Sequence, residues 1–315
     1  MNLSKAAVEY VVLKQSMGSR FHTESAILKA FCRAMGNVNV TEVGPEQVLA
    51  YIEGNGPVTR FWHRKCGTLR GFYRFAIGRG YAKCSPLPKT LPTPAAVFTP
   101  YIYSSDELRR LLSATKRCVS ARTKLEAQTL HMLLLLLYGA GLRISEALLL
   151  RPQDVDLDAC LLTIRESKFY KTRLVPVGEQ LADALLDYAK ERGRVGCPVD
   201  RCNTFFVTRS GEAVTRSMAE RAFCRIREAA SVHRDDGGRY QPRLHDLRHS
   251  FTVHRLIAWY REGADVQRLL PQLSTYLGHV HIAATQKYLT MTPELLNEAS
   301  KRFERYARPE EIGYD

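Results

Sequence analysis

Proline is concentrated in one segment of the chain, and this segment constrains the fold more than any other feature. Five prolines lie between Ser85 and Pro100, at positions 86, 88, 92, 94 and 100. Proline at this density blocks helices and central strands, because it has no backbone donor and a fixed φ. The sequence therefore predicts an extended linker over 85–100 that joins a first domain, residues 1–84, to a second domain, residues 101–315. An irregular loop inside one domain is the alternative.

The first 84 residues favour a helical domain that binds a polyanion. Apolar residues repeat at helical spacing around Phe31 and Ile52, and along a longer segment from Phe61 to the turn at Gly78. Residues 1–84 hold 12 Lys and Arg against 5 Asp and Glu, so they carry half of the chain's net charge of +14. Such an excess is typical of proteins that bind nucleic acid. A basic protein without a polyanionic partner is the alternative.

The second domain mixes helices with a small sheet. Ser104 and Glu107 have the spacing of a capping box, and a buried leucine-rich helix follows and ends near Gly141. Segments 161–164 and 173–177 predict two strands, with a turn at 168–172 between them. Most of the chain from Glu179 onward favours helix. The predicted fold class is therefore mainly α with a small β-sheet: a helical N-terminal domain followed by a mixed α+β domain.

Composition argues against a membrane protein and against a metal site. The longest apolar run, Leu133 to Tyr138, is too short to cross a bilayer, and residues 1–20 lack the apolar core of a signal peptide. We therefore expect a cytoplasmic protein with no membrane contact. The eight cysteines form no CxxC pair, and Cys197 and Cys202 lack a second ligand pair for zinc. We expect free, mostly buried thiols.

Four separate segments concentrate residues that suit chemistry on a phosphodiester. Guanidinium forks fit phosphate oxygens, and with histidine donors they can stabilise a pentavalent transition state without a metal. A tyrosine hydroxyl can be the nucleophile, and a lysine can protonate the departing alkoxide. The segments are 138–147 with Arg143 and Glu146, 167–173 with Lys168 and Lys171, 245–251 with His245, Arg248 and His249, and 277–288 with His279 and Tyr288.

Each of these residues, taken alone, has an ordinary structural explanation. An arginine after Gly-Leu is usually solvated or caps a helix, and Tyr288 alone is more often a packed aromatic. Histidines four apart on a helix can bind a metal, so a metal-dependent nuclease that uses His245, His249 and His254 is a remote alternative. The interpretation depends on all four segments occurring in one chain and in one order.

That order resembles the tyrosine recombinase, or phage integrase, family. The resemblance covers most of residues 100–292 and, more weakly, the helical region before it. Segment 141–146 looks like the first arginine box of the family, and segment 245–251 looks like its HxxR box. Leu277-Gly278-His279, followed nine residues later by Tyr288, looks like the nucleophile segment. The Arg-Leu-Val-Pro sequence after the hairpin and Leu69–Arg74 of the first domain are further similarities.

The resemblance implies a role for each residue that matches a family motif. Arg143 and Arg248 would bind the scissile phosphate, and Tyr288 would form a 3′-phosphotyrosyl link and free a 5′-hydroxyl. His245 and His279 would assist by proton handling and hydrogen bonding. Rejoining reverses this chemistry with another 5′-hydroxyl, so no ATP, metal or other cofactor is implied.

Supporting roles follow from the same resemblance. Lys168 would be the general acid for the 5′ oxygen, but this hairpin lacks the glycines of the usual family pattern, and Lys171 is the alternative. Glu146 matches an acidic position that supports the site, and we interpret His249 as structural support. His279, rather than His281, is selected by the preceding Leu277-Gly278.

Basic residues at helical spacing in the first domain are candidates for contact with the DNA backbone. They alternate with aromatic residues, which we expect in the core, and a solvated basic face is the alternative. The cations are Arg60, Arg64, Lys65, Arg70 and Arg74, and the aromatic residues are Phe61, Trp62, Phe72 and Tyr73.

The leading hypothesis is a site-specific recombinase of double-stranded DNA that acts as a homotetramer on two sites, alone or with a sister recombinase. Within it, an integrase or transposase of a mobile element is favoured over a Xer-type chromosome dimer resolvase, because the linker and first domain look less like Xer proteins. A type IB topoisomerase and a catalytically dead DNA-binding regulator are less favoured hypotheses. An amphipathic helix from Pro293 to Tyr306 would dock on a neighbouring protomer, or else pack against its own domain.

Overall fold

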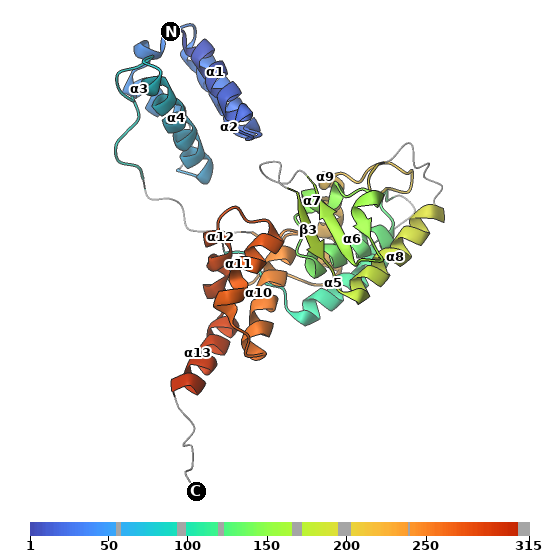
Figure 1. The fold of residues 1–315 in the computed structure, drawn as a ribbon. Coiled ribbons are helices and arrows are strands. Elements are labelled where there is room, and N and C mark those ends of the chain that lie inside the picture. Colours follow the sequence, from blue (N-terminus) through green and yellow to red (C-terminus); the bar gives the residue numbers. More distant parts are fainter. Residues whose placement is uncertain are drawn as a thin grey trace. The chain divides into compact units, whose positions relative to one another are not determined.

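The computed structural model describes residues 1–54, 58–92, 99–118, 123–165, 172–194, 203–238 and 240–307. These residues fall into two compact units, one before residue 99 and one from residue 99 onward (Figure 1). The fold is mainly helical with one small antiparallel sheet, which confirms the predicted fold class. Within the described ranges, no helix is long and apolar enough to cross a membrane.

The N-terminal unit is a group of helices around one apolar core. Its longest helix, α4, begins after Thr59, whose side chain accepts a hydrogen bond from the backbone N–H of Trp62. Trp62, Phe72 and Tyr73 are buried in that core, as predicted, but Phe61 is exposed, so the prediction that all four aromatic residues lie in the core is wrong for Phe61. The helices are α1 (Leu3–Ser16), α2 (His22–Met35), α3 (Pro45–Glu53) and α4 (Arg60–Gly78).

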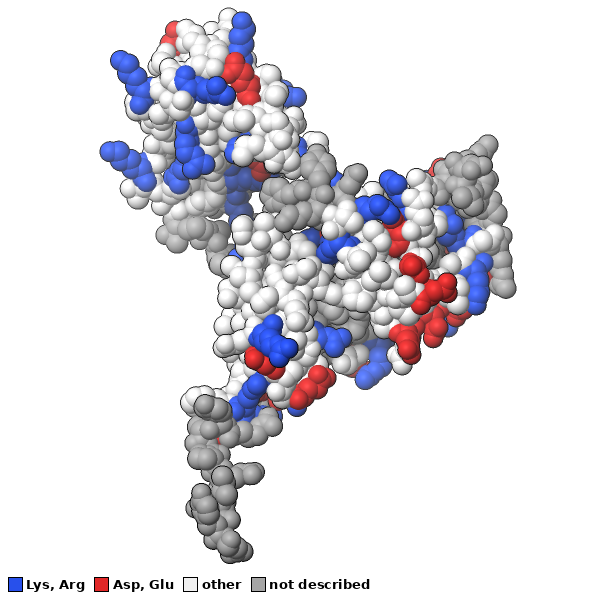
Figure 2. Space-filling model, in the orientation of Figure 1, with Lys and Arg blue, Asp and Glu red and all other residues white. Residues whose placement is uncertain are grey.

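Basic side chains predominate over acidic ones on the face of the N-terminal unit drawn in Figure 2. Arg70 and Arg74 of α4 are exposed. Arg64, in contrast, forms an ion pair with Glu24, and the ammonium group of Lys65 donates to the carbonyls of Tyr51 and Ile52 near the end of α3. Lys65 therefore serves as a cap for α3, whereas Arg70 and Arg74 face solvent.

The C-terminal unit begins with helices that surround a three-stranded sheet. The capping box at Ser104 is present as predicted, since Ser104 and Glu107 exchange side-chain to backbone hydrogen bonds at the start of α5. Strands β2 and β3 form the predicted hairpin, with Ile164 opposite Arg173, and a short strand β1 adds to it. The elements are α5 (Ser105–Arg117), α6 (Ala127–Gly139), α7 (Ile144–Leu148), β1 (Val155–Asp156), β2 (Leu161–Ile164), β3 (Arg173–Pro176), α8 (Glu179–Arg194) and α9 (Arg216–Ala229).

Residues 246–307 form a second group of helices in the same unit (orange to red in Figure 1). These helices pack around their own apolar cluster, which includes Phe251, Tyr288 and Leu295. Tyr138 and Tyr276 pack against both this cluster and the larger one around α6. The two groups thus meet near the ends of α6, α10 and α11. The elements are α10 (Asp246–Arg261), α11 (Val266–Leu277), α12 (Ala283–Gln286), the 3-10 helix Lys287–Thr290 and α13 (Pro293–Ala307).

The described cysteines are free thiols, but most are not buried. Cys66 is buried, whereas Cys84 and Cys224 are exposed and the other three described thiols are intermediate. The prediction of mostly buried thiols is therefore wrong, and Cys197 and Cys202 lie outside the described residues. In the ranges that the structure describes, no group of His, Cys, Asp and Glu is arranged to hold a metal ion.

Candidate active site

Two glycines in left-handed conformations bring the motif residues together. Gly141 has φ +59° between α6 and α7, and any side chain there would collide with the ring of Phe251 from α10. Arg143 lies two residues later and is the N-cap residue of α7. Gly278 has φ +67° as the C-cap of α11, and it turns the chain so that His279 faces Arg248. Glycine adopts this conformation without the penalty that other residues pay.

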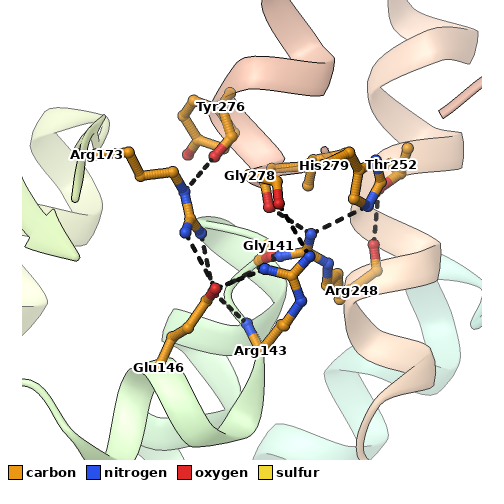
Figure 3. A network of polar contacts seen from close by, with 10 residues as sticks. Gly141, Arg143, Glu146, Arg173, Arg248, Thr252, Tyr276, Gly278 and His279 are labelled. Atoms are coloured by element: carbon orange, nitrogen blue, oxygen red, sulfur yellow. Dashed lines mark hydrogen bonds and ion pairs between the residues drawn. The ribbon is translucent and has the colours of Figure 1, made fainter. Parts of the chain in front are cut away.

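Three arginines and one buried carboxylate form the centre of the site (Figure 3). Arg173 binds Glu146 with both terminal nitrogens, at 3.0 and 2.8 Å. Arg143 donates to Glu146 at 2.6 Å, and Arg248 lies 3.8 Å from the other oxygen of the carboxylate. A carboxylate is stable in such a buried place only when its charge is paired.

The same three arginines bind the three carbonyls at the C-terminus of α11. Arg173 donates to Tyr276 O at 2.8 Å, Arg248 to Leu277 O at 2.6 Å and Arg143 to Gly278 O at 3.2 Å. These carbonyls have no partners within the helix and lie at its negative end, so positive charge is favourable there. One cluster of cations thus fixes the end of the helix that leads into His279.

Glu146 and Arg248 stay ionised in this cluster although both are buried. Burial alone would raise the pKa of Glu146, but the hydrogen bonds and charge of Arg173, with the charge of Arg143, outweigh it and lower that pKa to about 2. Burial and the charge of Arg143 lower the pKa of Arg248 to about 9, so this guanidinium stays charged at neutral pH. Arg143 is the most accessible of the three, with 29% of its side chain exposed against 2% for Arg248 and 9% for Arg173.

Hydrogen-bond partners fix the form of His279. A guanidinium only donates, so Nε2 of His279 accepts from Arg248 at 3.2 Å, and its Nδ1 carries the hydrogen and donates to Thr285 at 2.7 Å. Burial and the charges of Arg248 and Arg143 lower the pKa of His279 to about 4. His279 is therefore neutral at physiological pH in the DNA-free protein.

Tyr288 lies within the same unit and is only 4% exposed. Its hydroxyl oxygen is 2.8 Å from Nδ1 of His249, and its ring stacks with that of His279 at a centroid distance of 6.4 Å. Burial raises the pKa of Tyr288, although the charge of Arg248 opposes this. His245 is exposed beside His249, with ring centroids 4.9 Å apart.

A cleft of about 410 Å³ opens next to Arg143 and His245. Its lining is rich in cations, because Arg216 and Arg227 of α9 and Arg243 also line it. The arrangement provides converging guanidinium donors, neutral imidazole groups, a buried tyrosine hydroxyl and a basic approach, which suits phosphodiester chemistry.

Most of the predicted site residues converge. Arg143, Glu146, Arg248 and His279 share one network, and His249 links Tyr288 to His245. Lys168 and Lys171 lie outside the described residues. The α4 cations, Arg60, Arg64, Lys65, Arg70 and Arg74, belong to the other unit. Among the described residues, the histidines at 245, 249 and 254 are not arranged as a metal cluster; His249 contacts Tyr288 and His254 contacts Tyr138.

Arg173 was assigned no role from the sequence, although each of its guanidinium nitrogens has a partner in the network. Its only sequence signal is its place at the start of the Arg-Leu-Val-Pro segment. That segment resembles the family, but nothing in it indicates a partner 27 residues away.

Comparison with known proteins decides the family. The model of the phage integrase family matches residues 102–294, a range that includes the arginine, histidine and tyrosine motifs. The chain belongs to the phage integrase family of tyrosine recombinases. This recombinase is 35% identical over 305 residues, 96% of each chain, to a candidate integrase/recombinase of Sinorhizobium fredii, y4rB. It is 30% identical to the tyrosine recombinase XerA of Thermococcus kodakarensis over 81% of this chain and 79% of that protein.

Solved structures show the same fold at low sequence identity. The Tn1549 transposon integrase bound to transposon right end DNA matches this recombinase with a TM-score of 0.69 and 16% identity, over 98% of this chain and 100% of that one. A lambda integrase tetramer bound to a Holliday junction matches with a TM-score of 0.65 and 16% identity, over 91% and 77%. The recombinase fold therefore extends over both units of the chain.

Proposed function

We propose that this tyrosine recombinase cuts and rejoins double-stranded DNA at specific sites through a 3′-phosphotyrosyl link to Tyr288. The observation that carries the proposal is the convergence of Arg143, Arg248 and His279 on one point of the C-terminal unit, with the hydroxyl of Tyr288 buried beside them. These are the donors and the nucleophile that a metal-free transfer of a phosphodiester requires.

In the proposed reaction, Arg143 and Arg248 hold the non-bridging oxygens of the scissile phosphate. The oxygen of Tyr288 attacks phosphorus, the bond to the 5′ oxygen breaks, and Lys168 gives that oxygen a proton. His249 is placed to accept the proton of Tyr288, since its Nδ1 is 2.8 Å from the hydroxyl. Burial and the charge of Arg248 lower the pKa of His249 to about 4, so the imidazole is neutral and can accept a hydrogen bond. Attack by another 5′-hydroxyl then reverses these steps.

We further propose that residues 1–84 form a core DNA-binding domain that closes on the duplex together with residues 101–315, through the Pro-rich segment 85–100. The exposed cations of α4, Arg70 and Arg74, suit contact with phosphates. Neutralised phosphates release counterions, so affinity for DNA should fall steeply with salt.

Assembly into a tetramer on two DNA sites follows from the reaction, because exchange of two duplexes needs four cleavages and each protomer has one Tyr288. The relatives support this proposal, since a lambda integrase was solved as a tetramer on a Holliday junction. The apolar stripe of helix α13 is buried at one end and exposed at the other: Leu295 is buried in its own unit, whereas Phe303 is 68% exposed. We propose that its second half, with Phe303, docks on a neighbouring protomer.

Within this function, we favour the integrase of a mobile element over a Xer-type resolvase. Two Sinorhizobium fredii proteins that bear the integrase/recombinase designation match 96% and 95% of this chain at 35% and 33% identity. Proteins named XerA and XerC match at 30% and 29%. The higher identity includes the N-terminal unit, which contacts the recombination site in the proposed clamp. The DNA that flanks the gene tests the choice: inverted repeats or adjacent recombinase genes support a mobile element, and flanking DNA with neither feature contradicts it.

The covalent link gives the direct test of the proposed reaction. A nicked suicide substrate built from the flanking DNA should trap the parent protein as a covalent band on a denaturing gel, in the presence of EDTA. Tyr288→Phe should bind the same DNA without forming the band, because it lacks the attacking oxygen. Tyr260→Phe, which removes the hydroxyl of a half-buried tyrosine on α10, is the matched control and should keep the band. A band that persists in Tyr288→Phe would assign the attack to another residue.

A further inference from the structure

Arg173 is the least explained member of the cluster. Each of its three guanidinium nitrogens already has a partner: Nη1 and Nη2 bind the two oxygens of Glu146, and Nε binds Tyr276 O. A phosphate could reach it only by displacing a bidentate ion pair. Arg173 is therefore poorly placed to bind DNA, although it lies beside two arginines that are proposed to do so.

The charge of Glu146 shows why such an arginine is needed. Glu146 accepts hydrogen bonds from the backbone N–H of Arg143 at 3.0 Å and from its guanidinium at 2.6 Å, so it holds the start of α7 and aims Arg143. Its negative charge also competes with the scissile phosphate for that guanidinium. The bidentate contact with Arg173 satisfies the carboxylate, since fork-to-fork pairing is the strongest arrangement available to the two groups.

Arg173 also sets the net charge of the arginine cluster. Three guanidiniums and one carboxylate leave the described cluster with two net positive charges. A phosphodiester carries one negative charge, and a pentavalent phosphorane approaches two. Without Arg173 only one net positive charge would remain, and Arg143 would be the main counterion of Glu146.

Arg173 also ties strand β3 to the end of α11. Its Nε binds the carbonyl of Tyr276, and its guanidinium packs against Gly278, where an added Cβ would lie only 2.8 Å from Nη1. His279 is the next residue along the chain. Movement of Arg173 would therefore displace both Glu146 and the turn that positions His279.

We propose that Arg173 is a positioning residue of the active site, which neutralises Glu146 and thereby leaves Arg143 available to the scissile phosphate. This inference rests on the proposed function. It assigns to the hairpin strand a role in the reaction that is distinct from phosphate binding and from proton transfer.

The test compares single-turnover cleavage of the suicide substrate at saturating DNA with the dissociation constant for uncleaved DNA. Arg173→Met should lower the cleavage rate about tenfold or more, with little change in DNA affinity, because the loss arises within the bound complex. Glu146→Gln added to Arg173→Met should raise the rate about threefold over Arg173→Met and so restore part of the loss, because it removes the carboxylate that captures Arg143. Arg173→Lys should be faster than Arg173→Met, since its ammonium still neutralises Glu146.

Arg110→Met is the matched control, because Arg110 also binds a carboxylate, that of Asp106, and two backbone carbonyls, but on α5 away from the site. It should cleave at the parent rate. If the parent itself fails to cleave, the proposed function is wrong. If the parent cleaves and Arg173→Met cleaves equally fast, or if the double variant is no faster than Arg173→Met, Arg173 does not act by neutralising Glu146. Should Arg173→Met prove unfolded by circular dichroism, the comparison of Arg173→Lys with the parent decides. A rate at or above about one-half of the parent's supports neutralisation, and a lower rate overturns it.

Discussion

Gly278→Ala is the substitution whose effect the structure predicts most sharply, because two separable penalties act at this residue. Its φ of +67° is a left-handed conformation, which costs an alanine about 1–2 kcal/mol. Alanine also stiffens the unfolded chain, which returns about 0.4–1 kcal/mol. Conformation alone should therefore lower the free energy of unfolding by about 1 kcal/mol.

The second penalty is a collision with Arg173. The new Cβ would lie 2.8 Å from Nη1, 3.0 Å from Cζ and 3.2 Å from Nε of its guanidinium. This group is not a free side-chain end, because its three nitrogens are bound to Glu146 and Tyr276 O. Overpacking of this kind costs about 1–3 kcal/mol, so the total loss should be about 2–4 kcal/mol.

Gly263→Ala provides the matched control for the conformational part. Gly263 has φ +72°, but an added Cβ there meets nothing within 4 Å. Urea unfolding followed by circular dichroism should show a loss of about 1 kcal/mol for Gly263→Ala and clearly more for Gly278→Ala. Cleavage should also fall in Gly278→Ala and stay near the parent rate in Gly263→Ala, since only the first displaces Arg173 and His279.

A double-mutant cycle isolates the collision. In an Arg173→Ala background, Gly278→Ala should cost no more than Gly263→Ala, because the guanidinium is gone. The reasoning is refuted if the two glycine substitutions destabilise the parent equally, or if Gly278→Ala costs as much without Arg173 as with it.

Three further predictions address stability in acid, the role of Arg143 at the scissile phosphate, and assembly into tetramers. The pKa values of His249 and His279 are lowered to about 4 by burial and the charge of Arg248, so below pH 6.5 the unfolded chain binds protons that the native protein does not. The free energy of unfolding should therefore fall between pH 6.5 and 4. Urea titrations of a His249→Gln/His279→Gln variant should show a shallower decline with pH, and an unchanged slope would contradict the assignment. Arg143→Ala should slow cleavage about a hundredfold or more, and Arg143→Lys should not restore it because lysine lacks the planar fork; parent-like rates for Arg143→Lys would defeat the idea. Phe303→Ala should leave a folded protein that binds one DNA site but fails to form tetramers on two sites, as measured by light scattering on DNA. Active tetramers of this variant would exclude docking of α13 on a neighbouring protomer. Leu295 is unsuitable for this test because it is buried in its own unit.

Much of the fold and most residues of the candidate site could be predicted from the sequence. Capping residues and helical spacing act over a few neighbours, so α4, α5 and α6 were predictable from local pattern, as was the β2–β3 hairpin. The motif residues Arg143, Arg248 and His279 were predictable because their chemistry and order are properties of the chain itself.

Partners across the fold were decided only by the tertiary structure. Arg173 meets Glu146 because strand β3 is placed beside the start of α7, and Lys65 meets Tyr51 because α4 lies against the end of α3. A periodic pattern shows which face of an element is apolar, but it does not show which polar group of another element a long side chain will reach. That depends on how the elements pack, since burial leaves each charged group only the partners that the packed neighbours supply.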